Sequence, residues 1–241
     1  MSDLNSLEQE IRVRSEQYAT DPENSRYLSD VTLGSVIGPF VVGKTTTIRE
    51  ACSIDADFCR VRSFTTREPR IGEGEDTYYF LPHDIETLRV LRDQISARRV
   101  VQFTVHPTTN RVYGSFSSDY TRQYALLDTM PSSLENLDTV PFRGKKRIAL
   151  VTSPDEWLKR FELRTISTGT EDSRKRIKEG VASLEWALDQ GKELFWVDNT
   201  DREVGEVALE LIGIMREDKE QKPNKRLVGE KLLDVMRAIE L

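Results

Sequence analysis

The eight residues from Gly38 to Thr45 have the types and the spacing that bind phosphate. They read Gly-Pro-Phe-Val-Val-Gly-Lys-Thr and fit G-x-x-x-x-G-K-[ST], the P-loop motif. Its glycines let the backbone curl, so that N–H groups and the N-terminus of the next helix face phosphate oxygens. The lysine reaches the β and γ phosphates, and the threonine hydroxyl binds Mg²⁺. The contacts expected to a nucleotide come from Gly38, Val41, Val42, Gly43, Lys44, Thr45 and Thr46.

Strands and helices must position this loop, and the hydrophobic pattern predicts them. A short strand precedes the loop, and a helix begins near Lys44. Later, apolar strands over 124–128, 147–152 and 193–198 alternate with helices. Such alternation predicts a parallel sheet covered on both faces, the α/β class. The helices are expected at 5–19, 84–97, 154–164, 172–190, 203–216 and 227–241, and further strands at 78–81, 100–105 and 111–113.

The composition of the chain narrows the classes of ligand that it can bind. The chain has 241 residues, a net charge of −6, two cysteines and two histidines, which argues against nucleic acid, a disulfide framework or a zinc site. No apolar run is long enough to span a bilayer, so we expect a cytoplasmic protein with no membrane partner. Against this acidic background, four arginines gather in one short stretch and favour a small anionic ligand: Arg60, Arg62, Arg67 and Arg70.

The stretch beginning at Ser63 reads SFTTREPR and continues IGEGEDTYYF. It resembles the acceptor motif of the guanylate kinase family, S-x-T-T-R-x-P-R-x-G-E followed by a tyrosine-bearing strand, and the resemblance runs from about residue 32 to about residue 213. It implies a P-loop NTPase three-layer fold with an inserted acceptor-nucleotide lobe and an arginine-bearing lid. Arg67 and Arg70 are planar forks suited to a monophosphate, and Tyr79 and Tyr113 can add hydroxyl donors.

The resemblance also addresses the base of the acceptor. In the family a Glu accepts two hydrogen bonds from guanine and precedes a Tyr-Gly-Ser/Thr tripeptide, which Tyr113-Gly114-Ser115 matches. Gln102 stands at the position of that Glu, and an amide offers one acceptor and one donor. Three alternatives follow: weaker guanine selectivity, a substitute such as Glu75, or a different base. Ser63 and Ser115 are the other implied base contacts.

Metal and lid residues follow farther along the chain. Asp128 ends an apolar strand, where it fits the role of holding Mg²⁺ opposite Thr45. Arg160 and Arg164 lie four residues apart on one side of an expected helix. The loop TISTGTED, residues 165–172, and the arginines after it resemble the family's lid, with Arg176 a better match than Arg174.

These patterns predict an enzyme that transfers the γ-phosphoryl of MgATP to GMP, giving GDP and ADP. Lys44, Arg160, Arg164 and Arg176 would stabilise the transferred charge. Two other readings stay open: the same fold with another acceptor, such as a different nucleoside monophosphate or ribose bisphosphate, or a non-catalytic module that binds phosphopeptides. We expect a monomer or a homodimer. The expected organisation is a helical extension (1–30), a P-loop core (31–62 and 120–216, with a lid at about 160–178), an acceptor lobe (63–119), and a linker with a last helix (217–241).

Overall fold

The structure is a computed structural model that describes residues 3–15, 18–69, 78–106, 109–168, 170–191, 193–216 and 224–240. The chain divides into two compact units. The first unit comprises Met1–Thr32, Val61–Ala125 and Ser132–Gly144. The second unit comprises Leu33–Arg60, Leu126–Pro131 and Lys145–Leu241.

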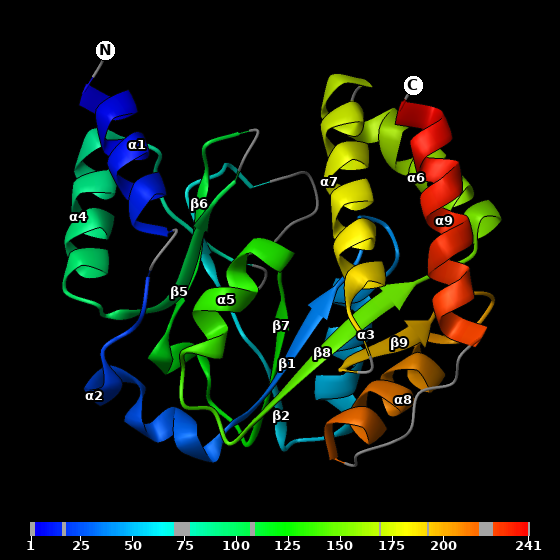
Figure 1. The fold of residues 1–241 in the computed structure, drawn as a ribbon, viewed down its shortest axis with the longest axis horizontal. Coiled ribbons are helices and arrows are strands. Elements are labelled where there is room, and N and C mark those ends of the chain that lie inside the picture. The colour runs from blue at the N-terminus through cyan, green and yellow to red at the C-terminus, as the bar shows by residue number, and fades with distance from the viewer. Residues whose placement is uncertain are drawn as a thin grey trace. The chain divides into compact units, whose positions relative to one another are not determined.

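A five-stranded sheet, most of which belongs to the second unit, has the strand order β2-β7-β1-β8-β9 (Figure 1). Since β7 separates β1 from β2, the chain crosses over through a helix between them. β8 and β9 pair in parallel, and every residue of β1 is buried, as in sheets covered on both faces. The predicted α/β P-loop NTPase fold is confirmed. The strands are β1 (Thr32–Ile37), β2 (Phe58–Arg60), β7 (Tyr124–Asp128), β8 (Gly144–Val151) and β9 (Leu194–Asp198).

The helices of the second unit are α3 (Lys44–Ile54), α6 (Pro154–Thr168), α7 (Thr170–Asp189), α8 (Val204–Arg216) and α9 (Asn224–Glu240). Ser153 caps α6, since its Oγ accepts the Glu156 N–H at 3.3 Å. α6 ends at Thr168 and α7 begins at Thr170, so the prediction of a loop over 165–172 is wrong. Those residues are helical except Gly169, which lies outside the described residues.

The last helix, α9, packs along α7 (Figure 1). Gly229 of α9 lies against the Trp196 ring of β9, where an added Cβ would lie 2.5 Å from a ring carbon. Lys225, in the first turn of α9, forms an ion pair with Glu210 of α8, which also pairs with Arg202 at 2.7 Å. The final helix is therefore part of the second unit.

The first unit contains a four-stranded sheet in the order β4-β3-β6-β5. β3 pairs in parallel with β4 and antiparallel with β6, which pairs antiparallel with β5. The elements are α1 (Asp3–Ser15), α2 (Pro22–Ser25), a 3₁₀ turn η1 (Arg26–Asp30), β3 (Phe64–Thr65), β4 (Tyr79–Phe80), α4 (Ile85–Ser96), β5 (Val100–Val105), β6 (Val112–Phe116), a 3₁₀ turn η2 (Ser117–Asp119) and α5 (Leu134–Asp138). A 3₁₀ turn η3 (Pro131–Ser133) has its first residue in the second unit and its other two in the first.

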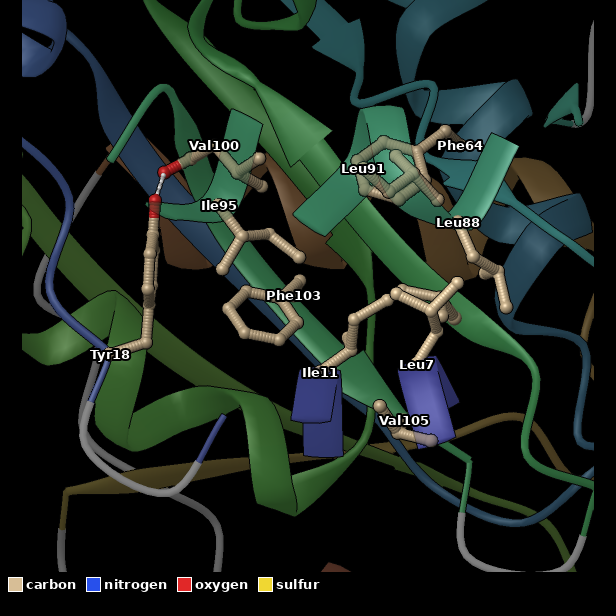
Figure 2. Close-up of a cluster of buried hydrophobic side chains, with 11 residues drawn as sticks. Leu7, Ile11, Tyr18, Phe64, Leu88, Leu91, Ile95, Val100, Phe103 and Val105 are labelled. Carbon is tan, nitrogen blue, oxygen red and sulfur yellow. Dashed lines mark hydrogen bonds between the residues drawn. The ribbon is translucent and has the colours of Figure 1, made fainter. Parts of the chain in front are cut away.

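One face of this sheet forms an apolar core with α1 and α4, as Figure 2 shows. Leu7 and Ile11 of α1 reach the same cluster as Phe103 of β5. The Tyr18 hydroxyl donates to the Val100 carbonyl at 2.6 Å, and its ring meets Phe103 edge-on. The first helix, whose role the sequence leaves open, is therefore built into the core of the first unit.

Among the described residues, none of the helices combines the length and the apolar character that crossing a bilayer requires.

Candidate functional site

The phosphate loop of the second unit has a backbone that few residues can adopt. Gly38 has a φ of 143°, and an added Cβ would lie 2.3 Å from the Leu150 carbonyl oxygen, so only glycine fits there. Gly43 has a φ of 100°. Val41, with a φ of 59°, is in the left-handed region, which costs a β-branched residue about 1–3 kcal/mol. Interactions around the loop must offset this strain.

Three side chains hold the loop from outside by its carbonyl groups. The Trp157 indole N–H donates to the Phe40 carbonyl at 3.0 Å. The Asn199 amide donates to the Val42 carbonyl at 2.7 Å, and Arg160 donates to the same oxygen at 3.3 Å. The carbonyl of Val42, an expected phosphate contact, therefore points toward Asn199 and Arg160.

These tethers orient the N–H groups of the loop. A peptide N–H points away from the adjoining carbonyl, so the N–H groups of Val41 and Gly43 are directed to the opposite side of the loop. The first intrahelical bond of α3 joins the Thr47 N–H to the Gly43 carbonyl at 2.9 Å. The N–H groups of residues 44–46 precede that bond and have no carbonyl partner within the helix. Together these donors form an anion cradle at a helix N-terminus.

The charged and hydroxyl groups of the motif lie at this cradle. Lys44 Nζ donates to the carbonyls of Gly38 and Pro39 at 2.8 and 2.9 Å, and lies 3.9 Å from Asp128 Oδ1. Thr45 Oγ1 donates to Asp128 Oδ2 at 3.2 Å. A hydroxyl and a carboxylate this close are the oxygen ligands that Mg²⁺ prefers, and its other positions are commonly filled by water and phosphate. Thr45 and Asp128 therefore fit the predicted magnesium site.

Two of the predicted lid arginines lie beside the loop. Arg160 contacts the Val42 carbonyl and is oriented by Glu156 at 2.9 Å. Arg176 is buried, and its guanidinium lies 6.0 Å from the Phe40 ring centre. Arg174 is exposed, so Arg176 is the arginine of that pair at the loop. Arg164 is exposed on α6, one turn beyond Arg160.

Sequence reasoning missed two of the three residues that hold the loop, Asn199 and Trp157. Asn199 directly follows β9, and polar residues after buried parallel strands commonly line ligand sites, so this position carried a usable signal. Trp157 carried none. It is fully buried, stacks on Phe161 with ring centres 5.0 Å apart, and meets Phe40 edge-on.

The polar face of the first unit's sheet holds the predicted acceptor residues. Gln102 lies opposite Ser115, and Thr104 and Thr65 both lie opposite Tyr113. Directly opposed residues share a face, and residues two apart along a strand do too. Ser63 therefore shares this face as well, whereas Phe64 and Phe103 face the apolar core.

Arg67 lies among aromatic rings near the same face. Its guanidinium is 5.0 Å from the Tyr78 ring centre and 5.3 Å from that of Phe80. Tyr78 meets Tyr113 with ring centres 6.0 Å apart. Arg67 also donates to the Glu68 carbonyl at 2.9 Å, and it is 9% exposed. Its planar guanidinium is therefore stacked near aromatic rings with little access to solvent.

The adjacent tyrosine lies elsewhere. Tyr79, the predicted phosphate contact, is 41% exposed and stacks under Arg62, whose guanidinium is 3.7 Å from the ring centre. Tyr78, not Tyr79, therefore accompanies Arg67, because successive residues of a strand point to opposite faces. Arg70 and Glu75 lie outside the described residues.

Gln102, Ser115 and Tyr120 form a buried polar cluster. The Gln102 amide Nε2 donates to Ser115 Oγ at 3.4 Å, and Ser115 Oγ lies 2.9 Å from the Tyr120 hydroxyl. Gln102 is 3% exposed, yet its Oε1 has no hydrogen-bond partner among the described residues. A buried carbonyl without a donor costs about 1–3 kcal/mol. This orphan acceptor marks the cluster as a place where a ligand N–H would be favoured.

Asp119, next to Tyr120, is a buried carboxylate with an altered affinity for protons. Burial raises the pKa of Asp119 to about 6, although the Phe116 N–H and the charge of Arg62 act in the opposite direction. The Phe116 N–H donates to Asp119 Oδ2 at 2.7 Å.

The first helix supports this face through a histidine. His83 lies 2.7 Å from Glu8 Oε1 through Nε2 and 3.2 Å from Thr66 Oγ1 through Nδ1. Thr66 Oγ1 also accepts the Val112 N–H at 2.9 Å. The segment that carries Arg67 is thereby fixed to both β6 and α1.

The strand order and the loop define a P-loop NTPase fold. Among solved structures, the chain is similar to the guanylate kinase from Anaplasma phagocytophilum, with a TM-score of 0.49 and 16% identity over 81% of this chain and 88% of that chain. No family model matches the chain, and no curated protein matches it. The functional proposal therefore depends on the residues of the two clusters.

Proposed function

We propose that this chain is a nucleoside monophosphate kinase that transfers the γ-phosphoryl of MgATP to GMP, as the resemblance of its acceptor motif implies. The observation that carries the proposal is the coexistence of two phosphate-compatible clusters. The second unit has an anion cradle with Lys44, Thr45 and Asp128. The first unit has a stacked arginine, Arg67, and the buried pair of Gln102 and Ser115 on the polar face of its sheet.

At the donor site, the chain would supply positioning and positive charge. Phosphoryl transfer depends on these and needs no covalent nucleophile from the protein. The loop N–H groups and Lys44 would bind the β and γ phosphates. Arg160 and Arg176 would stabilise charge on the phosphoryl group in flight, with Arg164 one turn farther along α6. Mg²⁺, held by Thr45 and Asp128, would supply charge neutralisation between the phosphates.

At the acceptor site, Arg67 and Arg70 would clamp the monophosphate as bidentate forks. Tyr113 and Tyr78 would add hydroxyl donors, and Tyr78 takes the place that the sequence assigned to Tyr79. Ser63, Gln102 and Ser115 would contact the base. A dry site suits this transfer, since water competes with the acceptor for the phosphoryl group.

A non-catalytic phosphopeptide module is the weaker alternative, because it has no use for a lysine and a threonine–aspartate pair at an anion cradle. The retained contacts of Lys44, Thr45 and Asp128 favour catalysis.

The test is ADP release from MgATP with GMP, dGMP, IMP, AMP, CMP and UMP as parallel acceptors. We expect turnover with GMP at least about tenfold above that with AMP, CMP or UMP, since one mismatched buried polar contact costs that much. ADP release that is independent of every acceptor would contradict the proposal.

The matched variant is Lys44→Ala. We expect it to lower kcat by at least about 100-fold, in the range measured for losing one transition-state donor. Lys231→Ala removes an exposed lysine of α9 and should leave kcat within about twofold. Equal activity of Lys44→Ala and the unaltered chain would refute the assignment of the loop.

A further inference from the structure

The buried amide of Gln102 has a donor end and an acceptor end, and the structure distinguishes them. The donor end, Nε2, faces Ser115 Oγ, and the acceptor end, Oε1, has no partner in the part of the chain that the structure describes. The extra residue of a β-bulge lies immediately before Gln102, between it and Val100. Bulges commonly redirect a side chain beside a ligand site.

The orientation of this amide depends on a third residue. A serine hydroxyl has a single proton, so Ser115 can accept from Gln102 Nε2 while its own proton is donated elsewhere. The Tyr120 hydroxyl lies 2.9 Å from Ser115 Oγ and can accept that proton. All three side chains are buried, Ser115 completely and Tyr120 at 5% exposure, so water offers no easy substitute.

We propose that Tyr120, acting through Ser115, orients Gln102 so that Oε1 alone is presented to the acceptor base. Given the kinase function proposed above, this site reads a 6-oxopurine monophosphate by one ring N–H. Guanine and hypoxanthine both carry that N–H. The 2-amino group that distinguishes guanine finds no second acceptor on an amide, whereas a carboxylate would provide one.

This assignment makes Tyr120 a positioning residue for specificity. Without its hydroxyl, the Ser115 proton is free to turn toward Gln102, and the amide then rotates to present Nε2. A carboxylate at position 102 has acceptors at both ends, so its presentation does not depend on Tyr120. The effects of the two positions must therefore be coupled.

The experiment measures kcat and KM for GMP and IMP with MgATP, and calorimetric affinities for both, on the full chain. The set comprises the unaltered chain, Gln102→Glu, Tyr120→Phe, the double variant and Tyr124→Phe. Tyr124→Phe is the matched control, since it removes the hydroxyl of another buried tyrosine of the first unit.

We expect the unaltered chain to use GMP and IMP with kcat/KM values within about threefold of each other. Gln102→Glu should raise the preference for GMP about 10- to 100-fold. Tyr120→Phe should raise KM for both about tenfold with little change in kcat, and should change KM less than twofold in the Gln102→Glu background. Tyr124→Phe should not alter the ratio.

A preference of the unaltered chain for GMP above about 30-fold overturns the proposal, and that measurement needs no variant to fold. An equal effect of Tyr120→Phe in both backgrounds reduces Tyr120 to a structural role and also overturns it. If no acceptor is phosphorylated, the kinase function fails. Equal calorimetric affinities for GMP and IMP then still support the single-acceptor assignment, and unequal affinities or no binding overturn it.

Discussion

The two clusters are built from different parts of the chain. In the second unit the cradle consists mainly of backbone N–H groups, directed by carbonyl tethers from Trp157, Asn199 and Arg160. In the first unit the cluster consists of side chains from separate strands, brought together by register. A backbone cradle depends on which residues can adopt a local conformation. A side-chain cluster depends on which face each residue occupies, so the two should fail for different reasons.

The largest expected effect is on the backbone cradle, through Gly38→Ala. The new methyl group would lie 2.3 Å from the Leu150 carbonyl oxygen, so the loop must shift. We expect about a 100-fold loss of affinity for MgATP, because the loop N–H groups are displaced and a displacement of about 1 Å can cost that factor. Affinity for GMP should change less than twofold, and calorimetry measures both.

The matched control is Gly205→Ala in α8, where an added Cβ meets no atom of the described residues within 4 Å. It should leave both affinities unchanged. Parallel losses of MgATP and GMP affinity in Gly38→Ala would show that the two clusters are not separable.

The next effect is on the side-chain cluster, through Arg67→Lys. This change keeps the positive charge and removes the planar fork that stacks near Tyr78 and Phe80. We expect KM for GMP to rise about 30-fold, roughly 2 kcal/mol, with MgATP affinity unchanged. Arg89→Lys, on an exposed position of α4, is the control. A loss confined to MgATP affinity would place Arg67 at the other cluster.

The smallest expected effect is on stability, which depends on pH through a buried carboxylate of the first unit. Asp119 has a pKa of about 6 in the folded chain, above its ordinary value near 3.9 when unfolded. The folded state thus holds this proton more tightly. The resulting stability is complete below about pH 4 and is lost as pH rises through 6.

Asp119→Asn keeps an oxygen for the Phe116 N–H and has no proton to lose. Relative to the unaltered chain, its free energy of unfolding should rise by about 1–2 kcal/mol between pH 4 and pH 8. Urea unfolding at pH 4, 5, 6 and 8 measures this difference. A difference that does not vary with pH would mean that Asp119 is ionised normally in the folded chain.

The sequence predicted the backbone cradle better than the side-chain cluster. Lys44, Thr45 and Asp128 come together as expected, because a P-loop between a strand and a helix fixes its own geometry. Gln102 and Ser115, both predicted base contacts, lie opposite each other and form a hydrogen bond that the sequence did not predict. Tyr78, not the predicted Tyr79, lies beside Arg67, because a shift of one residue along a strand reverses the face.

Other features depend on contacts between segments distant in the sequence. Asn199 and Trp157 reach the loop from positions 157 and 117 residues away from their carbonyl partners. The lid loop predicted over 165–172 is mostly helical. Threonine and glycine have low helix propensity, but the helices on either side extend into the segment. The placement of α1 also escaped prediction, because its partners lie on α4 and β5.

The position of α1 in the core has a consequence for how the chain is made. Tyr18 and Val100 are 82 positions apart, and Arg12 and Asn110 are 98 apart. During translation, α1 therefore emerges well before the strand and helix on which it packs. At 5–20 residues per second, Leu7 and Ile11 wait roughly 5–20 s for their partners. The nascent chain must keep these apolar side chains from aggregating until β5 has left the ribosome.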